Sequence, residues 1–138
     1  MTRAFAPGEA LPLRRYPVTQ ALVDLYAEAS GDHNPLHIDA AFAAGTFYGR
    51  TIAHGLLTLA LIGDAMTHAW GARWLQGGEL DVAFLAPVFP GDTVEIAAVV
   101  DSVDDERLTA TIECRAGGRL VVAGTASLST QDTTSKDN

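Results

Sequence analysis

The chain has 138 residues, which suits a single domain with a hydrophobic core of its own. Its 9 basic and 17 acidic residues give a formal net charge of −8, so we expect no nucleic-acid partner, because phosphate backbones are also negative. The single cysteine, Cys114, excludes an internal disulfide. With no secretory signal visible, this favours the cytoplasm. No apolar run approaches the roughly 20 residues that span a bilayer, so we expect no membrane partner.

The chain begins with a short extended segment, which Leu11, Leu13 and Tyr16 indicate. Thr19 has the chemistry of a helix N-cap, and apolar residues at helical spacing predict a helix over residues 22–29. Gly31 is expected to end this helix.

The next segment, residues 32–37, contains Pro35 and is expected to be irregular rather than helical. Proline lacks an N–H donor and restricts the residue before it. Asp39 then has the character of an N-cap for a short helix over residues 40–44.

Residues 54–70 predict the longest helix, and its apolar residues cover nearly the whole circumference. A helix that is apolar all round is typically buried. After it the apolar residues alternate, which predicts four consecutive strands in a meander. These strands lie within residues 80–84, 94–100, 108–114 and 120–128, and Gly117-Gly118 marks a hairpin.

This order of elements predicts an α+β fold, in which a curved antiparallel β-sheet wraps around one long buried central α-helix, residues 54–70. We expect one domain over residues 1–130. The polar residues 131–138 are expected to form a disordered tail.

The segment 32–37 carries the strongest chemical signal. Asp32 and His37 lie five positions apart on a loop containing proline, so both side chains can point into one cavity. A carboxylate and an imidazole beside one water can supply the base and the acid for adding water across an activated double bond. In a 2-enoyl thioester, conjugation of the double bond with the thioester already makes C3 electrophilic. The addition of water then needs no metal, so we expect neither a metal nor a cofactor.

The start of the long helix supplies a second chemical feature. Gly55 has no side chain to block its N–H, and helix N-termini stabilise negative charge. The Gly55 N–H is therefore a candidate oxyanion-hole donor for an enolate that forms on a thioester oxygen.

Three motifs together resemble the MaoC-like (R)-specific enoyl-CoA hydratases and dehydratases, which have the hotdog fold. The motifs are S-G-D-x-N-P-L-H-x-D, I-A-H-G-L-L and F-x-x-P-V-x-x-G-D, and the similarity runs from about residue 11 to 128. The resemblance implies a catalytic pair, Asp32 and His37, supported by Asn34 and His54, with Gly55 as the oxyanion hole. It also implies a homodimer, or a higher oligomer built from dimers.

The resemblance implies reversible hydration of 2-enoyl thioesters carried by coenzyme A. One departure is Gly63, where several members active on coenzyme A esters have serine. A 3-hydroxyacyl-[acyl-carrier-protein] dehydratase therefore stays open, with phosphopantetheine as the carrier group of the substrate.

Two other functions remain as alternatives. A hotdog acyl-CoA thioesterase would use Asp64 or Asp32 to direct water at the carbonyl, although a solvated or capping role for Asp64 is the simpler interpretation. A non-catalytic subunit that binds acyl thioesters is the other alternative, and the intact pair of Asp32 and His37 argues against it.

Several residues are candidates for contact with substrate, although ordinary core or surface placement is the alternative for each. Arg50 and Arg73 have the chemistry to bind the phosphates of a carrier arm. An apolar acyl tunnel is expected to be lined by Phe42, Phe47, Leu56, Leu57, Trp74 and Phe84.

Overall fold

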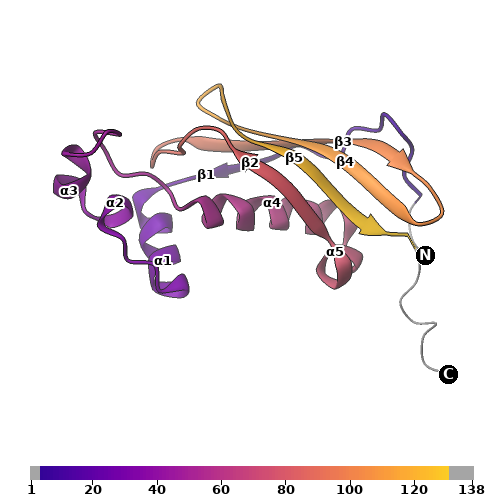
Figure 1. Cartoon of the computed structure of the whole chain (residues 1–138), viewed down its shortest axis with the longest axis horizontal. Coiled ribbons are helices and arrows are strands. Elements are labelled where there is room, and N and C mark those ends of the chain that lie inside the picture. Colours follow the sequence, from indigo (N-terminus) through magenta and orange to yellow (C-terminus); the bar gives the residue numbers. More distant parts are fainter. Residues whose placement is uncertain (1–3, 131–138) are drawn as a thin grey trace.

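The computed structural model describes residues 4–130, which fold into one curved five-stranded antiparallel sheet with helices on one side (Figure 1). The strands are β1 (Arg14–Pro17), β2 (Glu79–Phe84), β3 (Thr93–Val103), β4 (Arg107–Ala116) and β5 (Arg119–Ser129). Their order across the sheet is β1-β3-β4-β5-β2. The expected antiparallel sheet with one central helix is confirmed.

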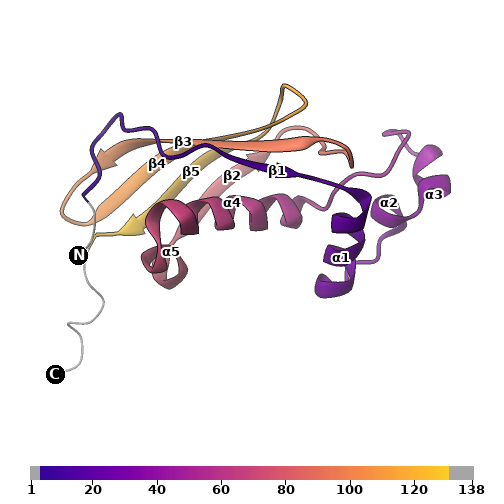
Figure 2. The ribbon, with the colours of Figure 1, turned by 180° about the vertical axis from the view of Figure 1, so that it is seen from behind.

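The longest helix, α4 (Gly55–Trp70), runs along one face of the sheet, and the other helices lie at its two ends (Figures 1 and 2). Three helices gather where α4 begins: α1 (Gln20–Ser30), α2 (Pro35–Ile38) and α3 (Ala40–Ala44). The last helix, α5 (Ala72–Gly77), follows α4 and was not expected from the sequence.

The meander predicted for the last four strands is correct for β3, β4 and β5 and wrong for β2. Strand β2 pairs with β5, with Leu80 opposite Ala126 and Phe84 opposite Val122, so it forms the edge of the sheet farthest from β1. Alternation of apolar residues shows which side chains face the core, but it does not identify the neighbouring strand. The Gly117-Gly118 hairpin between β4 and β5 is confirmed, since both glycines have positive φ.

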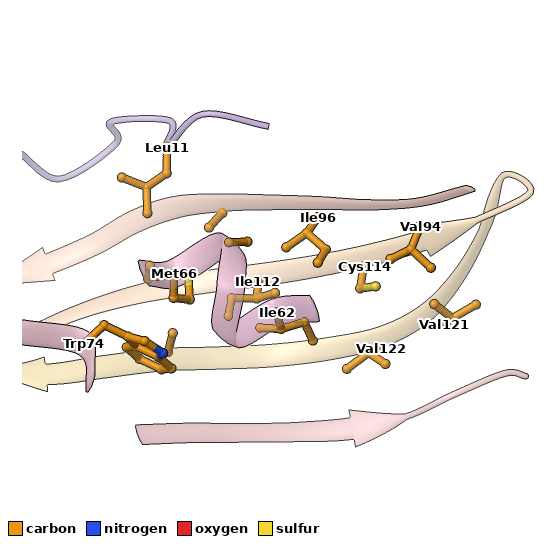
Figure 3. Packing of buried hydrophobic residues seen from close by; sticks show 14 of the residues in the cluster. Leu11, Ile62, Met66, Trp74, Val94, Ile96, Ile112, Cys114, Val121 and Val122 are labelled. Carbon is orange, nitrogen blue, oxygen red and sulfur yellow. The ribbon is translucent and has the colours of Figure 1, made fainter. Parts of the chain in front are cut away.

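The core lies between α4 and the sheet (Figure 3). Ile62 and Met66 of α4 face sheet residues such as Ile112 in the close view, and all three are fully buried. The expectation of a helix buried all round is wrong, because the sheet covers only one side: Leu56 remains 63% exposed. The buried residues of α4 are Leu57, Thr58, Ile62, Ala65, Met66 and Trp70.

The predicted helix ends in the first third of the chain are confirmed. The Thr19 hydroxyl accepts from the Leu22 N–H, and Gly31 adopts the left-handed conformation at the end of α1. The Asp39 carboxylate accepts from the Phe42 N–H and caps α3.

The segment around Pro35 differs from the expectation of an irregular loop, because α2 is a single helical turn that begins at Pro35. Proline is well tolerated at the first helical position, where its missing N–H costs no hydrogen bond. The Asn34 side chain caps this turn by accepting from the Leu36 N–H.

Two further expectations concern the C-terminal tail and membrane-spanning helices. The predicted tail, residues 131–138, lies outside them. Within residues 4–130, none of the helices combines the length and the apolar character that crossing a bilayer requires.

The only thiol of the chain lies in the core. Cys114 is fully buried on β4, and burial raises the pKa of its thiol from 9.0 to about 12. The reactive species is the thiolate, so we expect no labelling of the native protein by iodoacetamide at pH 8. Full labelling is expected in denaturing urea. Mass spectrometry of both samples checks this, and equal labelling rates would contradict the burial of Cys114.

Candidate active site

Asp32 lies in the segment between the end of α1 and the start of α2. These two helices lie at the end of the molecule where α4 begins (Figure 1). One of its carboxylate oxygens, Oδ1, accepts from the Asn34 N–H at 3.2 Å. The Asn34 side chain in turn accepts from the Leu36 N–H at 3.0 Å. The Asn34 backbone therefore orients the Asp32 carboxylate, and the Asn34 side chain caps the helical turn that carries His37.

His37 lies on α2, and its orientation is set by the main chain of a distant segment. Its Nδ1 lies 2.8 Å from the Ile52 carbonyl oxygen. A carbonyl can only accept, so Nδ1 carries the hydrogen, and in the neutral ring Nε2 keeps its lone pair. His37 is therefore held in the tautomer that can take a proton through Nε2.

His54 precedes α4 and packs against both members of the expected pair. Its side chain is almost fully buried, with the residue only 2% exposed. Its Nε2 donates to the Asp32 carbonyl oxygen at 3.0 Å, and its ring stacks on that of His37 with centroids 3.9 Å apart. The Tyr26 ring packs on it at 4.8 Å. His54 thus ties the Asp32 backbone and the His37 ring to the start of the central helix.

These groups converge on a small volume. One carboxylate oxygen of Asp32 and one ring nitrogen from each of His37 and His54 all lie within 4.8 Å of one another. One water that makes two hydrogen bonds of about 2.8 Å can bridge such a separation.

This trio also meets a distance criterion for holding a metal ion. The two imidazole rings, however, are stacked with an interplanar angle of 28°, so an ion in the plane of one ring would lie out of the plane of the other. The arrangement favours acid–base chemistry over a shared metal ion.

Gly55 lies at the edge of a pocket of about 310 Å³ beside the trio. No side chain caps the first turn of α4 in the part of the chain that the structure describes, which leaves the Gly55 N–H without a side-chain acceptor. The pocket wall consists of Tyr48, Ile52, Ala53, Gly55, Thr58, Phe84, Leu85, Ala86, Pro87, Val88 and Val122. Asp32 and His37 do not line it. Residues 52–55 connect the pair to the pocket, because they include wall residues and the Ile52 carbonyl that orients His37.

The residues expected to line an acyl tunnel are only partly brought together. Phe84 lines the pocket, and its ring would contact a Cβ added to Gly55 at 3.2 Å. Phe42 and Leu56 are exposed and Phe47 is 99% exposed, whereas Leu57 and Trp74 belong to the buried core. None of these five lines the pocket. Apolar character alone does not distinguish a pocket wall from a core or surface position.

The two arginines proposed as phosphate contacts lie in different places. Arg50 lies next to the pocket, between its wall residues Tyr48 and Ile52 in the sequence. Arg73 instead lines a second pocket together with Phe5 and Val103, and donates to the Ser129 carbonyl oxygen. Of the two arginines, only Arg50 therefore lies in a segment that supplies residues to the pocket at Gly55.

Supporting residues of the site escaped the sequence analysis because they carry no distinctive pattern. Gln20 donates to the His37 carbonyl oxygen at 2.8 Å and accepts from the Thr51 hydroxyl at 2.7 Å. Thr58 is buried in α4 and lines the pocket. A polar residue in the otherwise apolar first half of α4 was the one available signal for Thr58.

Asp64, the candidate base of a thioesterase, lies away from this site. It is nine residues beyond Gly55 on α4, which corresponds to about 14 Å along the helix. Its carboxylate accepts from the Tyr16 hydroxyl at 2.6 Å and lies 3.5 Å from His68 Nδ1. Burial and this hydrogen bond raise the pKa of Tyr16. Asp64 does not line the pocket beside Gly55 and instead joins the edge strand β1 to the helix.

Comparison with known proteins gives a family match over most of the chain. Residues 4–122 match the model of the family described as MaoC like domain. The chain is 37% identical over 107 residues to a 3-hydroxybutyryl-CoA dehydratase of Methylorubrum extorquens, covering 73% of this chain and 66% of that protein. It is 35% identical over 109 residues to an (R)-specific enoyl-CoA hydratase of Aeromonas caviae, covering 77% of this chain and 81% of that protein.

The fold is similar to that of solved structures as well. The (R)-hydratase from Aeromonas caviae involved in PHA biosynthesis superposes with a TM-score of 0.77 at 31% identity. The superposition covers 91% of this chain and 96% of that chain. The match to the dehydratase spans just under two thirds of that relative's length, whereas the match to the hydratase structure is nearly complete.

Proposed function

This chain is a member of the MaoC-like domain family, and on that basis we propose that it is a hydro-lyase that hydrates 2-enoyl thioesters reversibly. The names of its relatives support the reaction class and the (R) configuration of the 3-hydroxyacyl product. The convergence of Asp32 and His37 within 4.8 Å, beside the pocket that Gly55 lines, is the observation that carries the proposal.

The proposed mechanism uses one water held between the Asp32 carboxylate and His37 Nε2. One of the two takes a proton as the water oxygen attacks C3, and the π electrons move onto the thioester oxygen. The Gly55 N–H at the start of α4 stabilises this enolate. A proton then passes from the catalytic pair to C2, which completes the addition. In the reverse direction the same groups remove water from a 3-hydroxyacyl thioester.

No resident cofactor or metal is needed for this reaction, because conjugation with the thioester makes C3 electrophilic. The carrier of the acyl group is either coenzyme A or the phosphopantetheine arm of an acyl carrier protein. We propose the cytoplasm as the compartment, since the single thiol is buried and no disulfide is possible.

We also propose a homodimer as the working unit. Strand β2 is an edge strand whose outer side has no partner within residues 4–130, and Phe84 and Leu85 at its end are about half exposed. An edge strand with exposed apolar residues is a ready surface for a second copy. Sedimentation velocity at micromolar concentration tests this, and a monomer throughout would contradict it.

The main experiment incubates the protein with crotonyl-CoA. We expect the absorbance of the enoyl thioester to fall without release of free thiol, and the product to be (R)-3-hydroxybutyryl-CoA on a chiral column. A thioesterase would instead release thiol in step with the loss of substrate. Binding without any turnover, on crotonyl-CoA and on the crotonyl carrier protein alike, would indicate a non-catalytic subunit.

A further inference from the structure

Arg50 is not itself part of the pocket wall that Gly55 lines, but it lies in the segment between two wall residues, Tyr48 and Ile52. Residues 50–55 and residues 84–90 run side by side in opposite directions, as three contacts show. Parts of both segments line the pocket. Arg50 Nη2 donates to the Pro90 carbonyl oxygen at 2.6 Å, and the Ala53 N–H donates to the Val88 carbonyl oxygen at 2.8 Å. The third contact is the Phe84 ring, which packs against Gly55. Arg50 therefore lies just outside the wall, at the end of the two paired segments opposite Gly55.

The Arg50 side chain is held in place although it is exposed. Its guanidinium lies over the Phe89 ring, 4.6 Å from the centroid, and the guanidinium of Arg119 lies 5.0 Å from the same ring. Packing on an aromatic ring and one hydrogen bond to the main chain restrict the rotamers of a long side chain. Most of the five N–H donors of Arg50 remain available for a ligand.

The charge of Arg50 is not balanced by a carboxylate within the described residues. Arg119, beside it on Phe89, pairs with Asp92 at 2.6 Å. Arg14 and Arg73 also lack a carboxylate partner, but neither lies in a segment that supplies wall residues to the pocket at Gly55. The arginines that pair with a carboxylate are Arg15, Arg107, Arg115 and Arg119. In a chain with a net charge of −8, an ordered and unpaired guanidinium just outside a pocket favours an anionic ligand.

We infer that Arg50 binds the phosphate at the end of the pantetheine arm, which coenzyme A and carrier proteins share. The inference rests on the proposed function, since it assumes that the thioester carbonyl lies at Gly55. Arg50 lies five positions before Gly55, and a fully extended chain covers at most roughly 18 Å over that number of positions. A pantetheine arm laid along the wall has a comparable reach, and the planar guanidinium matches two phosphate oxygens.

The test compares three crotonyl thioesters that differ in their phosphates: crotonyl-CoA, crotonyl-phosphopantetheine and crotonyl-pantetheine, which has none. For Arg50→Ala we expect kcat/KM to fall about 10-fold or more on the two phosphorylated substrates, because a hydrogen bond to a charged group contributes about 1.5–3 kcal/mol. The loss is expected in KM, with kcat nearly unchanged. On crotonyl-pantetheine the variant is expected to match the wild type.

Arg15→Ala serves as the matched control, since it removes one positive charge from an exposed arginine on β1. It is expected to leave all three substrates unaffected. If Arg50→Ala lowers kcat/KM equally on all three, Arg50 only holds the loop at Pro90 and the inference is wrong. It is also wrong if nothing changes.

A wild type that turns over none of the three thioesters would contradict the proposed function and not this inference. Calorimetric titration with coenzyme A and with pantetheine then decides the inference. If Arg50→Ala weakens the binding of coenzyme A and not that of pantetheine, the inference is supported. If the binding of coenzyme A is unchanged, the inference is overturned.

Discussion

Replacing Asp32 by asparagine or His37 by glutamine is expected to lower kcat on crotonyl-CoA by about 10²- to 10⁴-fold, the usual contribution of a general acid or base. Both changes keep the size of the side chain and remove its ability to exchange a proton. The bond from His37 Nδ1 to the Ile52 carbonyl leaves Nε2 as the nitrogen that can face water, so a glutamine amide cannot replace it. Steady-state rates from the enoyl absorbance measure the loss.

His33→Gln is the matched control for this pair, because His33 lies in the same segment and is exposed, with only a 3.9 Å approach to Glu28. Its rate is expected to stay within twofold of the wild type. Circular dichroism should show the same helix and sheet content in all three variants. A folded Asp32→Asn or His37→Gln variant that keeps half of the wild-type rate would overturn the mechanism.

The largest expected effect on stability comes from Gly124→Ala, in the middle of β5. A Cβ at this position would lie 2.7 Å from the Val82 Cα and still closer to the Asp81 carbonyl oxygen. Both atoms belong to the backbone of β2, so the strand itself must move. Overpacking typically costs about 1–3 kcal/mol, and we expect the upper end of that range or more.

Urea denaturation gives the free energy of unfolding for this comparison. Gly77→Ala is the control, because a Cβ there meets no atom within 4 Å, and its free energy is expected within about 0.5 kcal/mol of the wild type. Since β2 carries Phe84 of the pocket wall, Gly124→Ala should also lower activity on crotonyl-CoA. A stability equal to that of the wild type would show that β2 does not pair closely with β5.

Local patterns predicted the elements of this fold well and their assembly less well. The caps at Thr19 and Asp39 and the hairpin at Gly117-Gly118 follow from the chemistry of a few adjacent residues. The pairing of β2 with β5 depends instead on contacts between segments about forty residues apart. The one-sided burial of α4 likewise depends on how far the sheet extends around it, which its own sequence does not specify.

The candidate site shows the same division. The spacing of Asp32 and His37 predicted their convergence because a single short segment carries both. The groups that orient them come from elsewhere: the Ile52 carbonyl and the Gln20 amide. A main-chain carbonyl is present at every residue, so no sequence pattern marks the one that binds a histidine. For the same reason Phe42 and Phe47 could not be distinguished from wall residues such as Phe84.

The bond between His37 and Ile52 gives residue 52 two separate roles. Its carbonyl orients the imidazole, whereas its side chain contributes to the pocket wall. Because the carbonyl is common to all amino acids, substitutions at this position can reshape the space for the acyl group while the proton-transfer geometry persists. Substrate range can therefore diverge among descendants of this protein without any change in the residues that perform the chemistry.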